Sequence, residues 1–334
     1  MTEQSINLVQ VIGTLKEINM KVEDAEVELK NSDGAKKSVT CKHISKAVFR
    51  NPMFLVESNG SDVGIEWFPI KEKMLDDDGN VVDNPKYKAM MTVMETYVPK
   101  SKDADNATRV FVKGSISPQE YVGKDGNWKS FSSINGFQIT SSNVPEEDST
   151  DSEISGIIKR IYPETKGEEG EETGRYKIEL CSFDYSGKVF PTTFIVEEDL
   201  VEGFADYYEV GSCAKLYFEI VSRQVGARKS ETTGGFGKRK ANIVSGFTVT
   251  EYSIFNGDDA YEAEDENGNP NKYFISSEEL KKALEEREFM IEKKIAESKE
   301  KSSTTTSSPR GASATASTNK PNPFGEKKRN PFAK

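Results

Sequence analysis

Apolar residues alternate with polar ones along much of the chain, as expected for strands that bury one face. Clusters of glycine, asparagine, aspartate and serine separate these segments and are typical of turns. In the first half we expect strands at 8–20, 25–30, 63–70, 109–120 and 127–141. In the second half we expect strands at 153–162, 175–183, 188–196, 212–224 and 240–252. Helical segments at 85–97 and 197–208 lie between the third and fourth strands of each half.

The two halves also share short stretches of sequence in the same order. The segments around Gly13 and Gly156 resemble each other, and so do those around Gly136-Phe137 and Gly246-Phe247. The first match has an offset of 143 residues and the second an offset of 110, so the first copy has 33 additional residues between the two motifs. We expect an inserted hairpin or loop at 71–85 to accommodate them.

Three strands, a helix and two strands is the element order of an OB-fold, a five-stranded Greek-key barrel. Gly13 and Gly156 suit this fold, because a barrel strand that bends at a corner often needs a residue without a side chain. Two unrelated β-rich domains with chance similarities are the alternative. The fold class that we predict is mainly β, with two tandem OB-fold domains, a C-terminal helix and a disordered tail.

The turn-rich and acidic segment after the first copy suits a linker, and the composition changes again after the second copy. We expect an OB-fold domain at 1–143, a linker at 144–152, a second OB-fold domain at 153–275, a helix at 276–301 and a disordered basic tail at 302–334. Ser276 or Ser277 caps the helix, with Glu279 placed for a capping box. Arg287 interrupts its apolar stripe. We favour a helix that docks on the second barrel over a coiled-coil oligomer.

Charge is distributed unevenly along the chain. The net charge is −11, yet the tail at 302–334 contains six basic residues and one acidic residue, so that the rest carries −16. The three cysteines are odd in number and widely spaced, which argues against a disulfide framework. The chain lacks an apolar run long enough to span a membrane and a signal-like N-terminus. We therefore expect a cytoplasmic protein, in the host cytoplasm if the chain is viral.

Few residues suit catalysis or a cofactor. His43 is the single histidine, and no nucleophile motif accompanies it. The segment 234–238 is glycine-rich, but Thr232 and Arg239 stand where a phosphate-binding loop requires glycine and Ser or Thr. We expect no enzymatic activity, no cofactor and no metal.

Basic and aromatic residues gather in three segments that suit nucleic acid, since lysine and arginine attract phosphates and aromatic rings stack on bases. The loop between the last two strands of the first copy offers Tyr121, Lys124, Trp128, Lys129 and Phe131. The matching loop of the second copy offers Arg228, Lys229, Phe236, Lys238, Arg239 and Lys240. A helix or loop inside the first copy offers Lys42, Lys46, Phe49 and Arg50. Trp128 and Phe131 could instead belong to the barrel core, and the acidic loop at 164–172 should avoid phosphates.

With its paired glycine strands and its tail, the chain resembles a bacteriophage-type single-stranded DNA-binding protein with tandem OB-folds. This resemblance implies a non-catalytic protein that coats single-stranded DNA in replication and recombination and recruits other proteins through its C-terminus. Unlike the acidic bacterial tail, this one is basic and contains two Asn-Pro-Phe segments, with Pro323 and Phe324 in one and Pro331 and Phe332 in the other. We expect partner docking there, with DNA binding or a spacer as alternatives.

Three functions remain open from the sequence. The first is binding of single-stranded DNA, or of RNA, with little sequence preference. The second is an acidic protein-interaction or inhibitory factor that binds a basic partner protein, and the third is an enzyme with OB-like accessory domains. Because few residues suit catalysis, an enzyme is the least favoured of the three.

Overall fold

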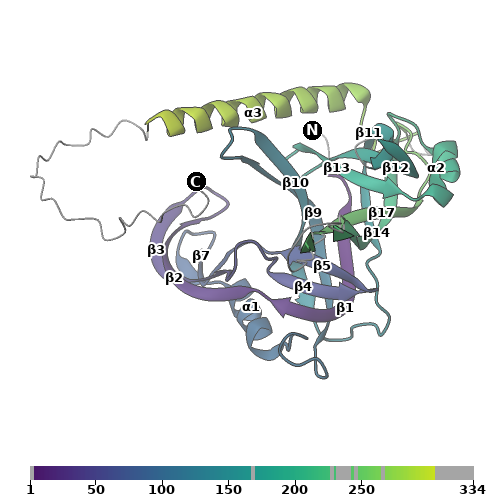
Figure 1. The fold of residues 1–334 in the computed structure, drawn as a ribbon. Helices are drawn as coiled ribbons and strands as arrows, with labels where there is room; N and C mark the ends of the chain where they lie inside the picture. Colours follow the sequence, from purple (N-terminus) through teal and green to yellow (C-terminus); the bar gives the residue numbers. More distant parts are fainter. Residues whose placement is uncertain are drawn as a thin grey trace, which may run out of the picture.

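Two closed rings of five strands form the centre of the molecule (Figure 1). The computed structural model describes residues 4–166, 170–225, 229–230, 242–243, 247–264 and 268–304. The first ring consists of β1 (Asn7–Ile18), β4 (Phe54–Ser58), β5 (Ser61–Glu66), β9 (Arg109–Val122) and β10 (Trp128–Thr140). The second consists of β11 (Ser152–Lys166), β12 (Glu171–Phe183), β13 (Val189–Val196), β14 (Cys213–Val225) and β17 (Phe247–Gly257).

Both rings have the same strand order. In the first, β1 pairs with β4 and β9, and the parallel pair β5–β10 lies on the other side of the ring. In the second, β11 pairs with β12 and β14, and the parallel pair is β13–β17. Numbered along the chain, the strands of each ring follow the order 1-2-3-5-4-1, a five-stranded Greek-key barrel of the OB type. The predicted fold class is confirmed.

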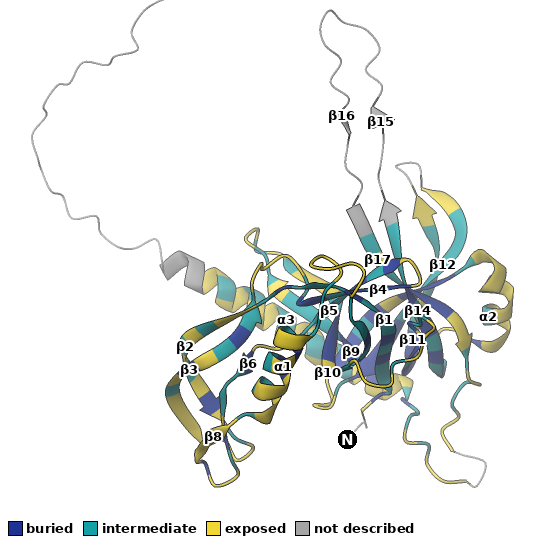
Figure 2. Cartoon of the chain, turned by 90° about the horizontal axis from the view of Figure 1, so that it is seen from below, coloured by how far each residue is buried: buried dark blue, intermediate teal, exposed yellow. Residues whose placement is uncertain are grey.

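Alternating side chains fill the two barrels, and the strands of the rings carry most of the buried residues in Figure 2. Phe54 is fully buried in the first barrel, and Phe194 and Phe218 meet edge to face in the second with their ring centroids 5.2 Å apart. Each such side chain stabilises the fold by roughly 1.5–3 kcal/mol relative to an exposed one. The polar residues between them face outward, as the sequence pattern predicts.

Gly13 and Gly156 have the role that the repeat suggests. A Cβ atom at Gly13 would lie 2.2 Å from the carbonyl oxygen of Glu57, and one at Gly156 would lie 2.5 Å from that of Cys181. Only glycine lets the first strand of each barrel approach the second this closely. A β-bulge follows two residues later in both barrels, between Leu15 and Glu17 in β1 and at the matching position of β11.

The second sequence match is out of register. Phe137 is the bulged residue of β10, because Gly136 pairs with Gly114 and Gln138 with Lys113. The bulged residue of β17 is Phe255, which makes the offset between these strands 118 residues rather than 110. Phe247, the expected counterpart, pairs with Val225 at the far end of β17. The error has a simple cause: alternation repeats every two residues, so a strand matches its relative equally well after an even shift.

The second strand of the first barrel is also different from the expected one. Residues 25–30 belong to β2 (Met20–Lys30), which pairs with β3 (Lys36–Lys46) and β6 (Ile70–Lys71) in a separate sheet. The inserted residues thus lie mainly between the first and second barrel strands. The hairpin expected at 71–85 is present but short, with β7 (Lys73–Leu75) and β8 (Val81–Asp83). The segment around Lys42, expected as a helix or loop, is strand β3.

Helices connect the third and fourth strands of each barrel, as predicted. These are α1 (Pro85–Thr96) in the first barrel and η1 (Glu198–Leu200) with α2 (Val201–Tyr207) in the second. Helix α3 (Ser277–Thr304) begins with the predicted capping box, in which Ser276 and Glu279 exchange hydrogen bonds of 3.1 and 3.2 Å. No helix in the described ranges has the length and apolar character needed to cross a membrane.

The two barrels are joined by direct strand pairing and by α3. Asn7 and Leu8 of β1 pair with β11, and Ser149 forms a bridge with Ile12, so that residues 144–152 lie against the first barrel. Leu280 of α3 packs into an apolar cluster of the second barrel. Further along, Arg287 forms an ion pair with Glu120 of β9, and α3 crosses both barrels (Figure 1). The residue that interrupts the apolar stripe therefore contacts the first barrel.

Candidate nucleic-acid interface

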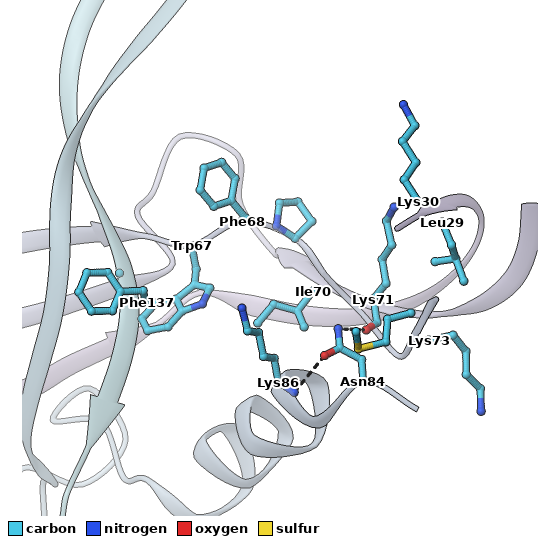
Figure 3. Close-up of a pocket in the computed structure, with 13 residues that line it drawn as sticks. Leu29, Lys30, Trp67, Phe68, Ile70, Lys71, Lys73, Asn84, Lys86 and Phe137 are labelled. Carbon is cyan, nitrogen blue, oxygen red and sulfur yellow. Dashed lines mark hydrogen bonds between the residues drawn. The ribbon is translucent and has the colours of Figure 1, made fainter. Parts of the chain in front are cut away.

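A cavity of about 300 Å³ lies where β5 ends and β10 bulges, between the first barrel and the β2–β3–β6 sheet (Figure 3). Three aromatic side chains line one side of it, and four lysines come from β2, β6, β7 and α1. The aromatic residues are Trp67, Phe68 and Phe137, and the lysines are Lys30, Lys71, Lys73 and Lys86. No acidic residue is among those that line the cavity. We call this site the basic pocket.

Local backbone features aim the aromatic residues into the basic pocket. Gly136 has no side chain, and a Cβ atom there would lie 2.3 Å from Cζ3 of Trp67, so the indole ring rests directly on the β10 backbone. The bulge turns the next residue, Phe137, outward, where 60% of it is exposed. A bulge that re-aims one side chain is a common device near binding sites. Phe68 is also exposed and stands beside Trp67 (Figure 3).

The lysines of the basic pocket differ in whether a carboxylate of the protein already pairs with them. Lys30 lies 3.2 Å from a carboxylate oxygen of Glu28, and Lys73 lies 2.5 Å from one of Asp83. Hydrogen bonds to these carboxylates raise the pKa of both lysines above its ordinary value. Lys71 donates to the backbone carbonyl of Glu28. Within the described ranges, Lys86 has no ion pair.

Asn84 fixes Lys86 relative to the rest of the pocket. Its side-chain oxygen accepts a hydrogen bond from the backbone amide of Lys86, which caps α1, and its side-chain nitrogen donates to the carbonyl of Lys71. These bonds are 3.0 and 2.8 Å long. Proline at the first helical position suits this start, since its missing N–H would be unpaired there anyway. The helix end is thereby tied to β6, and the Lys86 side chain points toward Trp67 (Figure 3).

The predicted aromatic loop of the first copy is the β9–β10 hairpin, and its two faces differ. Trp128 and Glu120 face α3, where Lys294 lies 5.3 Å from the centre of the indole ring. Side chains alternate along a strand, so Tyr121 and Phe131 lie on the opposite face. They are exposed and meet edge to face, 6.4 Å apart. This hairpin therefore offers an aromatic pair to solvent, while Trp128 packs against α3.

The lysines of the same hairpin lie near its tip. Lys124 is exposed in the turn, and Lys129 pairs with Asp125 at 3.2 Å. Neither lines the basic pocket.

The predicted cluster at 42–50 forms the end of β3 and the following turn. Lys42 and Arg50 are exposed, whereas Lys46 is paired with Glu66 at 2.6 Å. Asn19 holds the turn through hydrogen bonds with Val48, and Phe49 is left 89% exposed. These residues do not line the basic pocket.

Most of the residues predicted in the second copy lie outside the described part of the chain. Lys229 is the exception: it belongs to β15 (Lys229–Ser230), which pairs with β16 (Asn242–Ile243) beyond the end of β14. The predicted residues outside the described ranges are Arg228, Phe236, Lys238, Arg239, Lys240, Pro323, Phe324, Pro331 and Phe332.

The acidic loop of the second barrel is partly neutralised by its neighbours. Glu164 lies 3.0 Å from Arg175 and 3.4 Å from Lys177, and Arg175 also contacts Glu197 and Glu251. Arg175 and Glu251 are both largely buried, so this network holds strands of the second barrel together. Its cations are engaged with protein carboxylates and offer little to a phosphate.

Residues suited to metal binding do not converge in the described ranges, where no group of three or more His, Cys, Asp and Glu side chains is placed to hold an ion. His43 lies 3.2 Å from Glu23 on the neighbouring strand β2. All three cysteines are free and buried.

The basic pocket was not predicted from the sequence. Its lysines are spread from Lys30 to Lys86, and each is unremarkable in its own segment. One signal was available: Gly136-Phe137 stands out in the strand pattern, and a glycine beside an exposed aromatic residue indicates a close approach of another group. The partner of that glycine, Trp67, could be identified only from the fold.

Comparisons with known proteins give one family and a distant structural likeness. A deletion variant of the single-stranded DNA-binding protein from Thermus aquaticus is similar over 78% of this chain and 96% of its own, with 12% sequence identity and a TM-score of 0.38. The wild-type form is similar over 79% of this chain and 97% of its own, with 10% identity and a TM-score of 0.39. No curated protein matched the sequence. The model of the YorF family matches residues 5–301, and this chain belongs to that family.

Proposed function

We propose that this protein binds single-stranded DNA with little sequence preference, and that the basic pocket is its main contact site. The observation that carries the proposal is the combination of three aromatic side chains and four lysines around one cavity without an acidic lining residue. Proteins that bind single strands combine these two elements, because every base has a flat face to stack and every nucleotide a phosphate.

The pocket favours an unpaired strand over a duplex. A base can enter the cavity between Phe137 and the Trp67–Phe68 pair only if it has left its own stack, and base pairing prevents that in a duplex. Stacking on an aromatic side chain contributes roughly 1–3 kcal/mol per base. Tyr121 of β9 and Phe131 of β10 form an exposed aromatic pair that offers a second stacking position. Strand β10 is also the strand that carries Phe137.

We propose a wider role that is consistent with this chemistry. A non-catalytic protein with this site would protect exposed strands in replication or recombination, in the manner of a tandem OB-fold protein with domains at 1–143 and 153–275. The predicted basic loop of the second copy would add phosphate contacts. The Asn-Pro-Phe segments of the tail would recruit further proteins to the covered strand.

Tryptophan fluorescence tests the proposal directly, because the chain has only two tryptophans, Trp67 and Trp128. In a Trp128→Phe variant, Trp67 is the single reporter, and we expect oligo(dT) to quench its emission. In the matched Trp67→Phe variant, Trp128 lies against α3, and we expect little quenching. The titration is repeated with single-stranded RNA and duplex DNA at two salt concentrations. Equal quenching of both variants, or duplex binding as tight as oligo(dT) binding, would overturn the proposal.

A protein-interaction factor is the second candidate, and one observation favours it. The second barrel has a cavity at the position that matches the basic pocket, beside the bulged Phe255, and no lysine or arginine lines it. Asp199 and Asp259 are among the residues that line it. This cavity suits a basic ligand rather than a phosphate.

A further inference from the structure

The second barrel has an acidic and aromatic cavity of about 410 Å³, which we call the acidic pocket. It lies between α2, the end of β13 and the bulge of β17, where the first barrel has its basic pocket between α1, the end of β5 and the bulge of β10. The residues that matter for its chemistry are Leu200, Phe204, Tyr207, Phe255, Asp199 and Asp259. The two barrels therefore present equivalent sites with opposite charge.

Apolar surface is left open at the acidic pocket. Tyr207 is 66% exposed and Phe255 is 43% exposed, and Leu200 is exposed beside them. Below them, Tyr208 is buried, and its hydroxyl donates a 2.5 Å hydrogen bond to the carbonyl of Asp258. The floor of the pocket is thus fixed, while aromatic rings at the rim face solvent.

Two segments of the chain at the acidic pocket are strongly acidic. Residues 197–209 contain six acidic residues and no basic one, and residues 256–264 contain four acidic residues and no basic one. Of these, Glu197 is paired with arginines of the barrel. A ligand for this site should carry positive charge together with an apolar or aromatic group.

The chain itself contains a segment with that chemistry. Residues 302–334 have six basic residues and one acidic residue, and they include Phe324 and Phe332, each preceded by Asn-Pro. Lys327, Lys328 and Arg329 lie between the two phenylalanines. Proline before phenylalanine restricts the backbone, which lowers the entropy lost when the ring is bound.

The length of α3 separates the acidic pocket from the start of the tail in the same molecule. Helix α3 begins on the side of α2 and ends on the opposite side of the molecule (Figure 1). Its 28 residues span about 42 Å at 1.5 Å per residue. An idealised flexible coil of 20 residues, the sequence separation between Thr304 and Phe324, would have a root-mean-square span of about 25 Å. The tail would have to stretch to return to its own pocket.

We propose that the acidic pocket binds the basic Asn-Pro-Phe tail of a second copy of this chain. The phenylalanine inserts beside Tyr207 and Phe255, and the lysines and arginine of the tail lie against the surrounding carboxylates. One copy then links to the next, tail to pocket. This contact does not depend on DNA, so its test is independent of the proposed DNA binding.

Sedimentation velocity of the full chain without nucleic acid tests this contact. The pocket variant carries Tyr207→Ala and Phe255→Ala, and the tail variant carries Phe324→Ala and Phe332→Ala. We expect the unchanged chain to associate as its concentration rises, and each variant alone to stay monomeric. An equimolar mixture of the two should again form a 1:1 complex, because one variant retains the tail and the other the pocket. Added salt should weaken this complex.

Tyr185→Ala is the matched control, since Tyr185 is an exposed aromatic residue on the turn before β13 and does not line the pocket. It should associate like the unchanged chain, and thermal melts should show that all variants remain folded. A monomeric unchanged chain at every concentration would overturn the proposal, including the case in which the tail occupies its own pocket. A mixture that fails to associate, or a pocket variant that associates normally, would do the same.

Discussion

Lys86 is the residue of the basic pocket whose contribution to DNA binding can be calculated most simply, because no carboxylate in the described ranges pairs with its ammonium group. A lysine that neutralises one phosphate of a single strand contributes about 0.7 to the slope of log K against log salt concentration. Lys86→Gln should therefore lower that slope by about 0.7. At about 0.1 M salt this corresponds to a roughly fivefold weaker affinity, or about 1 kcal/mol, and near 1 M the difference should vanish.

Lys88→Gln is the control for this measurement. Lys88 is exposed on the same helix, α1, but does not line the basic pocket, and its replacement changes the net charge equally. Anisotropy titrations of oligo(dT) at four or more salt concentrations give both slopes. If the two variants lose affinity equally, the effect of Lys86 comes from overall charge. If the slope of Lys86→Gln equals that of the unchanged chain, Lys86 does not contact a phosphate, and the reasoning is refuted.

Three further predictions concern stacking, barrel closure and buried thiols. Phe137→Leu should weaken oligo(dT) binding by roughly 1–3 kcal/mol without a change in the salt slope, whereas Tyr185→Leu should leave binding unchanged in the same titrations. Gly13→Ala should lower the free energy of unfolding, measured in urea, by about 1–3 kcal/mol, because the new Cβ atom would meet the carbonyl of Glu57. Gly203→Ala is the control: this glycine of α2 has open space around it, so the substitution should raise the free energy of unfolding by about 0.5–1 kcal/mol. Burial raises the pKa of Cys181 from 9.0 to about 11, so this thiol should react slowly with a disulfide reagent at pH 8 until the chain is unfolded. The pKa of Cys181 is higher in the folded chain than in the unfolded chain, so its contribution to the free energy of unfolding should be fully present below pH 9 and be lost as the pH rises through 11. Urea unfolding at a series of pH values measures this loss.

Local structure in this protein follows from short-range patterns in the sequence. Alternation of apolar and polar residues predicted nearly all strands of both barrels. Capping chemistry predicted that α3 starts at Ser276 or Ser277, and Ser276 forms the capping box. The agreement between Gly13 and Gly156 predicted the repeated barrel, because the close approach of two strands there excludes any larger residue. The strands and the helix cap depend on residues that are close together in the sequence. The paired glycines mark positions at which only glycine fits.

Strand partners and the candidate site were decided by the tertiary structure. Alternation does not show which strands pair, so β2 was interpreted as a barrel strand. For the same reason the counterpart of Phe137 was predicted at Phe247, eight residues before the bulged Phe255. The basic pocket combines residues from Leu29 to Phe137, brought together by a sheet that lies outside the barrel. Long-range hydrogen bonds and close packing set these positions, and both depend on the whole chain having folded.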